Sequence, residues 1–173
     1  ALADLARPEI RERLLRIWTD PDSLNPARVS AQVTREVSQH LASLARSLEK
    51  AGHPPQHVAG YLTRCLFSMF AEDVALLPQG AFLGLLQTHR KDPSGLQQML
   101  RILWSDMDHG GFSATLVKPV LRFNGKLFKE ASAEGYSLLL STAQIDLLIQ
   151  AAKSNWREVE PAIFGTLLER ALD

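Results

Sequence analysis

The chain has 173 residues, of which 46% are hydrophobic and 22% are charged, a balance that fits one globular domain and excludes a disordered chain. Nineteen Lys and Arg residues balance nineteen Asp and Glu residues. No overall field therefore draws the protein to DNA or to an anionic membrane, and any nucleic-acid contact must come from a local patch. The single Cys65 excludes an internal disulfide framework, and no apolar run is long enough to span a bilayer. We expect a cytoplasmic protein and, since the chain begins with Ala1, a piece of a longer reading frame.

Helix signals dominate the chain, and each is bounded by Pro, Gly or a capping residue. Between Pro26 and Ala51, Val and Leu recur at steps of three and four residues, which places them on one narrow stripe of a helix. The segment after Pro55, as far as about Leu77, is apolar nearly all round, which is typical of the buried centre of a domain. Together these signals predict helices over residues 8–18, 26–51, 55–77, 81–90, 94–107, 141–153 and 161–172.

Residues 112–140 form the one irregular segment. They contain Pro119, Gly125 and Gly135 and alternate only weakly, which predicts an ordered connection that can include a short hairpin. We find no internal repeat and no linker long enough to divide two domains. The predicted fold is therefore an all-α, single-domain bundle of several helices with one irregular segment.

Motifs for several kinds of catalysis are absent from the sequence. It contains neither of the glycine-rich phosphate-binding patterns and no nucleophile elbow. Cys65 lies among large apolar residues, where a thiol is usually inert core. His53 and His57 are four residues apart, but Pro54-Pro55 separates them and no further ligand pair accompanies them, as zinc would require. The sequence thus predicts no catalytic, cofactor-binding or metal-binding residue and no small-molecule substrate.

Two acidic features leave alternatives open. The run SDMDHGG (residues 105–111) resembles the beginning of a calcium loop, but Val117 stands where a bidentate Glu is needed, so we favour a helix end capped by glycine. Glu72 and Asp73 lie in an apolar helix, where a buried carboxylate needs a partner or must be protonated. Arg64 is about two turns away and too far for a pair within the helix, so we expect a partner from another helix. Catalytic or metal-binding carboxylates are the alternative.

A basic ridge lies opposite the apolar stripe of the helix over residues 26–51. Its arginines fall within about 20° of one another when residues are projected at 100° steps. Phosphate contacts favour such groups, although Glu36 and Glu49 flank the ridge and most charged helix faces are only solvated. The ridge consists of Arg28, Arg35, Arg46 and Lys50, with Gln32 and Gln39 beside them.

Three stretches together resemble a known family: RCLFSMFAEDVALLP (residues 64–78), FNGKLF (residues 123–128) and NWREVEPAIFGTLLERALD (residues 155–173). Their order and spacing are similar to the helical spacer domain of MmeI-like, type IIG/IIL fused restriction-modification enzymes and of related adenine-specific DNA methyltransferases. The resemblance begins at about Ile17 and so covers nearly the whole chain. Lys126 departs from the family pattern, which often has a second Gly there, and so does Leu168, where an aromatic residue is frequent.

The resemblance implies that residues 1–173 are a helical spacer domain and a fragment of a longer protein. In this family a nuclease region precedes the spacer and a methyltransferase dependent on S-adenosylmethionine follows it. The cofactor segment and the catalytic motif lie beyond this chain, so S-adenosylmethionine is expected in the parent methyltransferase domain and no catalytic residue is carried over. The motif residues are expected to be structural: Arg64, Phe70, Glu72, Asp73, Phe123, Asn124, Gly125, Trp156, Glu160, Pro161, Phe164 and Gly165.

Two functions follow as hypotheses. The first is a non-catalytic spacer that positions the adjacent nuclease and adenine methyltransferase domains of the same chain on DNA. The alternative is a module that binds the DNA backbone through the basic ridge. An independent enzyme would need a pocket with convergent polar groups, and the sequence supplies no recognisable set.

Overall fold

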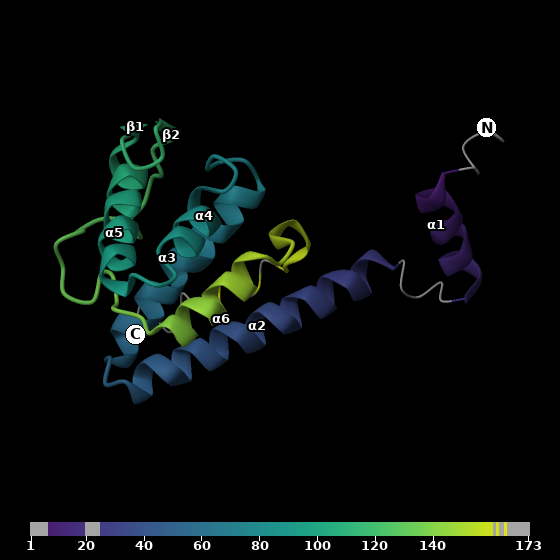
Figure 1. Ribbon diagram of the computed structural model, residues 1–173, viewed down its shortest axis with the longest axis horizontal. Helices are drawn as coiled ribbons and strands as arrows, with labels where there is room; N and C mark the ends of the chain where they lie inside the picture. The colour runs from purple at the N-terminus through teal and green to yellow at the C-terminus, as the bar shows by residue number, and fades with distance from the viewer. Residues whose placement is uncertain (1–6, 20–24, 161, 163–164, 166–173) are drawn as a thin grey trace.

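The computed structural model describes residues 7–19, 25–160, 162 and 165, and its architecture is helical (Figure 1). The α-helices are α1 (Pro8–Thr19), α2 (Pro26–Lys50), α3 (Pro55–Asp73), α4 (Ala81–Thr88), α5 (Pro93–His109) and α6 (Thr142–Ala152). Strands β1 (Gly111–Ser113) and β2 (Lys118–Val120) follow α5, and the 3-10 helix η3 (Trp156–Glu158) follows α6. The all-α expectation is confirmed, with a short hairpin in the irregular segment. The helix expected over residues 161–172 lies, except for Ala162 and Gly165, outside the described residues.

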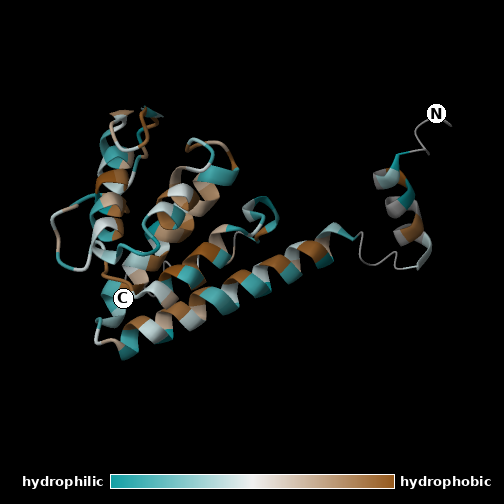
Figure 2. Ribbon diagram, in the orientation of Figure 1, coloured by the Kyte–Doolittle hydropathy of each residue, from teal (hydrophilic) through white to brown (hydrophobic). Residues whose placement is uncertain are grey.

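α2 is a long amphipathic helix with sharply defined ends. The Asn25 side chain accepts a hydrogen bond from the Ala27 backbone N–H and caps the N-terminus. At the other end Gly52 has φ 94° and donates its N–H to the Glu49 carbonyl, which closes the helix in a Schellman motif. Apolar and polar residues alternate along α2, with the apolar side toward α6 (Figure 2). The buried residues all lie from the middle of the helix onward: Val37, Leu41, Leu44 and Leu48.

α3 lies at the centre of the core, as its apolar sequence predicts. Side chains around its whole circumference are buried, among them Val58, Tyr61, Leu62, Cys65, Leu66 and Met69. The expected helix end at about Leu77 is wrong, because α3 ends at Asp73. Ala75 takes a left-handed φ of 61°, and the Leu76 N–H turns back to the Ala71 carbonyl. Leu77 is still buried, so the apolar run continues into the core after the helix has stopped.

α5 has a proline start and a glycine end. The Asp92 side chain accepts a hydrogen bond of 3.0 Å from the Gly95 N–H, and Pro93 occupies the first turn. The helix ends at His109, and Gly110 has φ 71°. The glycine-capped helix end that we favoured over a calcium loop is therefore confirmed.

The hairpin that follows α5 is antiparallel, with Phe112 opposite Pro119. It is fixed to α5 because the Ser113 hydroxyl donates to the Asp106 carboxylate at 2.5 Å and Val120 is buried in the core. From there residues 121–140 run as an irregular connection past α5 and back to α6 (Figure 1).

α6 packs against α2 in the opposite direction. Ser141 caps α6 in a capping box with Gln144, as the sequence predicts for Ser141. The Gln144 side-chain amide also donates to the Ser47 hydroxyl near the C-terminal end of α2. The Arg90 guanidinium, just beyond α4, pairs with the Asp146 carboxylate on α6 through two hydrogen bonds. Within the described part of the chain, no helix is both long and apolar enough to span a bilayer.

Candidate functional site

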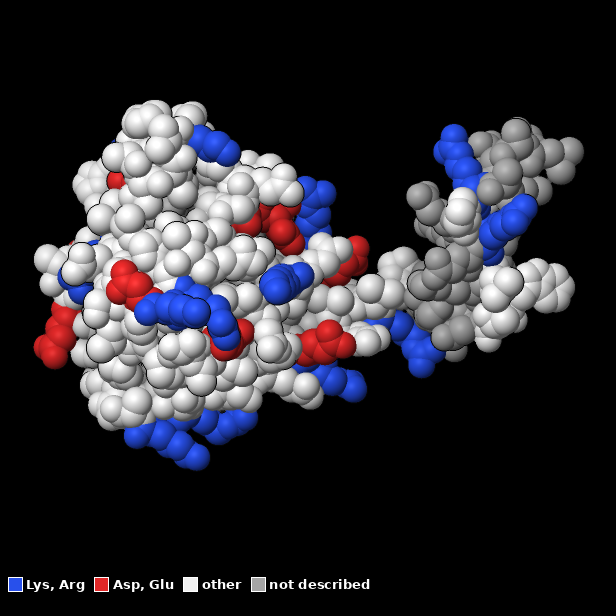
Figure 3. Space-filling view, viewed as in Figure 1, with Lys and Arg blue, Asp and Glu red and all other residues white. Residues whose placement is uncertain are grey.

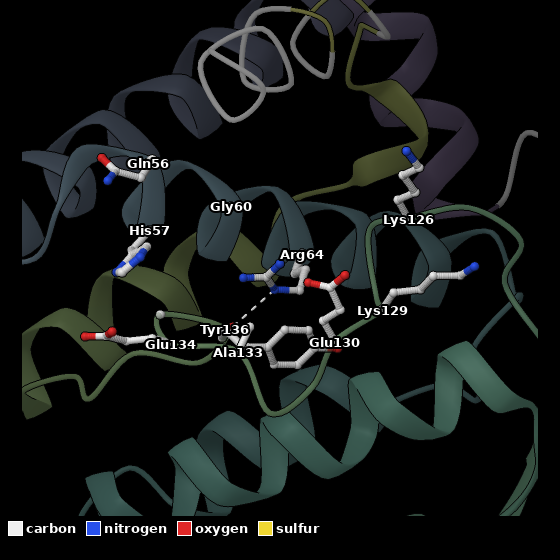
Figure 4. A pocket seen from close by; sticks show the side chains of 11 residues that line it. Gln56, His57, Gly60, Arg64, Lys126, Lys129, Glu130, Ala133, Glu134 and Tyr136 are labelled. Atoms are coloured by element: carbon white, nitrogen blue, oxygen red, sulfur yellow. Dashed lines mark hydrogen bonds between the residues drawn. The ribbon is translucent and has the colours of Figure 1, made fainter.

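The Arg64 side chain joins α3 to the irregular segment. Its Nε donates to the Tyr136 carbonyl at 3.2 Å, and its Nη1 donates to the Leu127 carbonyl at 3.4 Å (Figure 4). The guanidinium also lies over the Tyr136 ring, 4.4 Å from its centre, and 5.5 Å from the centre of the Trp104 ring. Arg64 thus satisfies two loop carbonyls and is held in one orientation by two aromatic rings.

Three phenylalanines extend this junction. Phe67 of α3 meets Phe123 and Phe128 edge to face, with ring centres 5.5 and 5.6 Å apart. Phe123 and Phe128 are 6.1 Å apart, so the rings form a closed aromatic cluster between the first and second motif segments. Gly125, between them, has φ 130°, and Asn124 beside it is exposed, as suits a tight turn at the surface.

The Glu72 carboxylate caps the N-terminus of α4. It accepts hydrogen bonds from the backbone N–H groups of Gly80, Phe82 and Leu83, at 3.0, 2.6 and 3.2 Å. These N–H groups have no acceptor within their own helix, and the helix dipole favours a negative charge at this position. The partner does come from another helix, but it is a set of backbone N–H groups rather than a basic side chain.

The Asp73 carboxylate joins α3 to the third motif segment. It accepts a hydrogen bond of 2.6 Å from the Trp156 backbone N–H, while the Arg157 side chain donates to the Asp73 carbonyl at 2.7 Å. The Trp156 ring is fully buried and donates to the Ala151 carbonyl. Trp156 is therefore a core residue of this chain.

The other motif residues vary in their surroundings. Phe70 is partly buried against the core. The Glu160 backbone N–H donates to the Thr34 hydroxyl at 2.9 Å. Gly165 is exposed, with open space where a Cβ would lie. Pro161 and Phe164 lie outside the described residues.

Sequence reasoning missed Tyr136, which the structure places at the centre of the junction. Its hydroxyl donates to the Phe128 carbonyl at 2.7 Å, and its ring stacks under Arg64. Arg101, also missed, donates to the Ala131 carbonyl of the same loop. Tyr136 follows Gly135 in a weakly patterned stretch, and no local signal links it to an arginine more than seventy residues earlier.

Cys65 has the burial and the protonation behaviour of a core residue. The thiol is fully buried, and burial raises its pKa to about 12. A thiol that stays protonated at neutral pH is a poor nucleophile. Among the described residues, no group of three or more His, Cys, Asp or Glu side chains could hold a metal ion.

The basic ridge is exposed along the outer side of α2. Arg28, Arg35, Arg46 and Lys50 are all exposed. Figure 3 shows Lys and Arg side chains projecting along the edge of the molecule formed by α2. Gln32 donates to Glu36 and Arg46 donates to Ser43 along the same helix, so the ridge is partly bound to its own neighbours. The spacing that predicts a common face is therefore realised, and whether the face contacts DNA stays a hypothesis.

A cavity of about 540 Å³ opens beside the junction, between α3 and the loop of residues 126–136 (Figure 4). Arg64 and Tyr136 line it from the core side, and Lys126 and Lys129 line it from the loop. His57 lies at the other end, where its ring packs against Gly135 so closely that a Cβ there would come within 2.2 Å. The loop can approach α3 only because residue 135 is glycine.

Comparison with known proteins relates part of this sequence to one family. Residues 56–128 match the family described as MmeI, helicase spacer domain. The resemblance to MmeI spacer domains is confirmed. The matched range begins at the start of α3 and ends with the FNGKLF motif, so it contains Arg64 and the three phenylalanines of the aromatic cluster, while Tyr136 lies beyond it.

The chain is also similar to part of a known DNA methyltransferase. The chain is 29% identical, over 113 residues, to DNA methyltransferase A of Bacillus subtilis (strain 168). That alignment covers 63% of this chain and 12% of the relative, so the chain spans only a small part of the relative's length. No solved structure matches the chain.

Proposed function

We propose that this chain is the non-catalytic helical spacer of a longer protein. In that protein it would hold a nuclease region and an adenine-specific methyltransferase at a fixed separation and orientation on DNA. The cofactor, S-adenosylmethionine, would bind in the adjacent methyltransferase domain, and the whole protein would work in the cytoplasm. The chain's own partners would be these neighbouring domains.

One observation carries the proposal: α3 is joined directly to both of the other motif segments. Its Arg64 and Phe67 hold the second segment, and Asp73 near its C-terminal end holds the third. A block tied together in this way transmits a fixed distance, whereas a flexible linker would let the distance between two active sites vary. The side chains that could otherwise do chemistry, Glu72 and Asp73, are engaged in these structural contacts.

The test is replacement of the spacer in the full-length parent protein. We would replace residues 25–160 by a flexible Gly/Ser linker and map the cleavage position relative to the recognition site, together with the methylation rate. The proposal expects a broadened distribution of cleavage positions and slower methylation. A control protein would carry Glu49→Gln, an exposed change on α2, and should match the wild type. Unchanged cleavage position and methylation in the replaced protein would refute the spacer role.

A second candidate function is binding of the DNA backbone through the basic ridge. The observation that favours it is the exposure of Arg28, Arg35, Arg46 and Lys50 along one face of α2. Basic groups on one helix face can contact successive phosphates without reading base sequence. This function would add affinity for DNA to the spacer role and is compatible with it.

Fluorescence anisotropy of a labelled duplex tests this candidate with the 173-residue chain. Substitution of Arg28, Arg35 and Arg46 by Glu should weaken binding equally for unrelated sequences. It should also reduce the steepness of the slope of log K against log salt concentration by about 0.9 for each phosphate that the protein no longer neutralises. The matched control replaces Lys91, Lys118 and Lys153 by Glu, which changes the net charge equally away from the ridge. Equal weakening in the two triple variants would show a general charge effect and remove the ridge as a binding site.

A further inference from the structure

Arg64 brings a positive charge to the cavity, and among the described residues no carboxylate is recorded within ion-pair distance of it. The Arg64 Nε–H and one N–H of Nη1 donate to loop carbonyls, which are neutral acceptors. Within the described part of the chain, the structure records no ion pair for Arg64 and no hydrogen bond from its Nη2. Burial lowers the pKa of Arg64, which means that its surroundings stabilise the cation less well than water does.

Gly60 keeps this guanidinium accessible from the cavity. It lies one helical turn before Arg64 on α3, and a Cβ built at Gly60 would be 3.5 Å from Arg64 Nη2 and 3.7 Å from Nη1. Gly60 is inside a helix, where glycine costs about 1 kcal/mol relative to alanine. Any larger side chain would occupy space next to the two terminal nitrogens.

The rim of the cavity adds further positive charge. Lys126 and Lys129 line one end, while Glu130 and Glu134 line the loop side. All four are exposed, so their side chains can turn toward or away from a ligand, whereas Arg64 is fixed by its two carbonyl bonds and two aromatic rings. In Figure 4 the two lysines lie together at one end, and Glu134 lies at the opposite end. The two lysines therefore add positive charge at this end, and in Figure 4 the Glu130 carboxylate lies between them and Arg64.

We propose that this cavity binds a phosphate group, with the free N–H donors of Arg64 as the fixed contact and Lys126 and Lys129 as mobile ones. The guanidinium offers neighbouring N–H groups that match two oxygens of a phosphate, and its orientation is already set before the ligand arrives. The lining holds three basic side chains and two acidic ones, and the acidic ones, Glu130 and Glu134, are exposed and can turn away from an anion. The phosphate could belong to a small molecule or to the DNA backbone, and the same contacts would serve both. This site lies on α3 and the loop, apart from the basic ridge of α2, and does not depend on the spacer role.

The first experiment is an NMR titration of the isotope-labelled 173-residue chain with inorganic phosphate, with sodium acetate at the same ionic strength and pH as the reference. We expect saturable shifts in the backbone signals of Gly60, Lys129 and Gly135 and in the Arg64 Nε–H signal with phosphate. Acetate should produce much smaller shifts. Equal shifts with both salts, or phosphate shifts confined to other regions, would overturn the proposal.

Variants separate this site from general charge effects. Gly60→Leu places a side chain beside the Arg64 terminal nitrogens without altering a charged group, and it should abolish the saturable shifts. Lys126→Gln with Lys129→Gln should raise the dissociation constant by about fivefold or more. The matched control, Lys91→Gln with Lys153→Gln, removes the same charge away from both the cavity and the basic ridge and should leave the constant within about twofold. Equal weakening in both double variants, or full binding by Gly60→Leu in a folded chain, would refute the assignment.

A second titration distinguishes the two sources of phosphate. A short DNA duplex is added to the wild type and to Gly60→Leu, with and without excess inorganic phosphate. If the DNA backbone is the source, the duplex shifts the same cavity signals, and both Gly60→Leu and inorganic phosphate reduce those shifts. If the source is a small molecule, inorganic phosphate still shifts the cavity signals and the duplex does not.

Discussion

The Asp73 carboxylate accepts a hydrogen bond of 2.6 Å from the backbone N–H of Trp156, although the two residues are 83 positions apart. The bond fixes the C-terminal end of α3 to the start of η3, where the Trp156 ring is fully buried. A short bond to an ionised acceptor is among the stronger hydrogen bonds in proteins. This contact therefore closes the third motif segment onto the central helix.

Asp73→Ala should lower the free energy of unfolding by about 1–3 kcal/mol, because the Trp156 N–H loses an ionised acceptor. Asp73→Asn keeps one acceptor oxygen in nearly the same place and should recover a large part of that stability. Urea unfolding followed by Trp fluorescence measures both changes. If Asp73→Ala and Asp73→Asn are as stable as the wild type, the hydrogen bond does not hold the segment.

Glu72→Gln should weaken the start of α4. The carboxylate accepts three backbone N–H groups, and an amide offers one oxygen and no negative charge, so we expect a loss of about 1 kcal/mol. Amide hydrogen exchange should become faster at Phe82 and Leu83. The control is Glu49→Gln on the exposed face of α2, which should change stability by less than about 0.5 kcal/mol. Similar effects from the two variants would argue against the capping role.

Ala75→Gly should stabilise the protein. Ala75 holds φ 61° at the end of α3, a conformation that glycine adopts without the strain that a Cβ causes, and we expect a gain of about 0.5–1 kcal/mol. Gly52→Ala, at the equivalent position after α2, should cost about 1 kcal/mol. A Cβ at Gly52 would meet nothing within 4 Å, so that cost would come from the backbone alone. Thermal unfolding of both variants measures the two changes in stability. A loss of stability in Ala75→Gly together with a gain in Gly52→Ala would disprove the left-handed conformation at these two positions.

Cys65 should make the protein less stable in alkali. Burial raises the pKa of its thiol to about 12, whereas an unfolded thiol ionises at about 8.5. Between these values the unfolded chain loses a proton that the folded chain keeps, so the free energy of unfolding falls as pH rises above about 8.5. Burial also raises the pKa of Tyr61, but a free tyrosine ionises only near pH 10.

Urea unfolding of the wild type and of Cys65→Ala at pH 7, 8.5 and 9.5 tests this expectation. The wild type should lose stability across the series, and the variant, although less stable at pH 7, should lose less between pH 8.5 and 9.5. Parallel pH dependences would show that the thiol does not carry the effect.

The helices follow from local signals in the sequence, and for this reason most of them can be predicted. The signals act within one helical turn or along one helix face, so their effect can be predicted without a structure. They include the caps Asn25, Gly52 and Ser141 and the Val/Leu stripe of α2. The end of α3 is harder to place because Leu76 and Leu77 are apolar, while the turn depends on Ala75, which carries no stop signal.

The contacts of the candidate site cannot be read from the sequence to the same extent. The pattern indicates that Glu72 and Asp73 need partners, but those partners are backbone N–H groups, which every residue except proline carries. Arg64 likewise bonds to carbonyl oxygens of a loop without regular periodicity. A contact between a side chain and a distant backbone group cannot be predicted from residue types or their spacing. Contacts of this kind join the motif segments in this protein.

Because burial along α2 is unequal, a small rotation at its buried end would displace its exposed end by a larger distance. The helix has 25 residues and is about 37 Å long, yet its buried side chains all lie between Val37 and Leu48. From Pro26 to Gln32 no side chain is buried, and the packing of α2 against the core begins at Val33 and Thr34, so the first two turns extend beyond the core. A tilt of about 5° at the Leu48 end moves the Pro26 end by about 3 Å over that length. Small repacking around Leu44 and Leu48 would therefore be amplified at the far end of the helix.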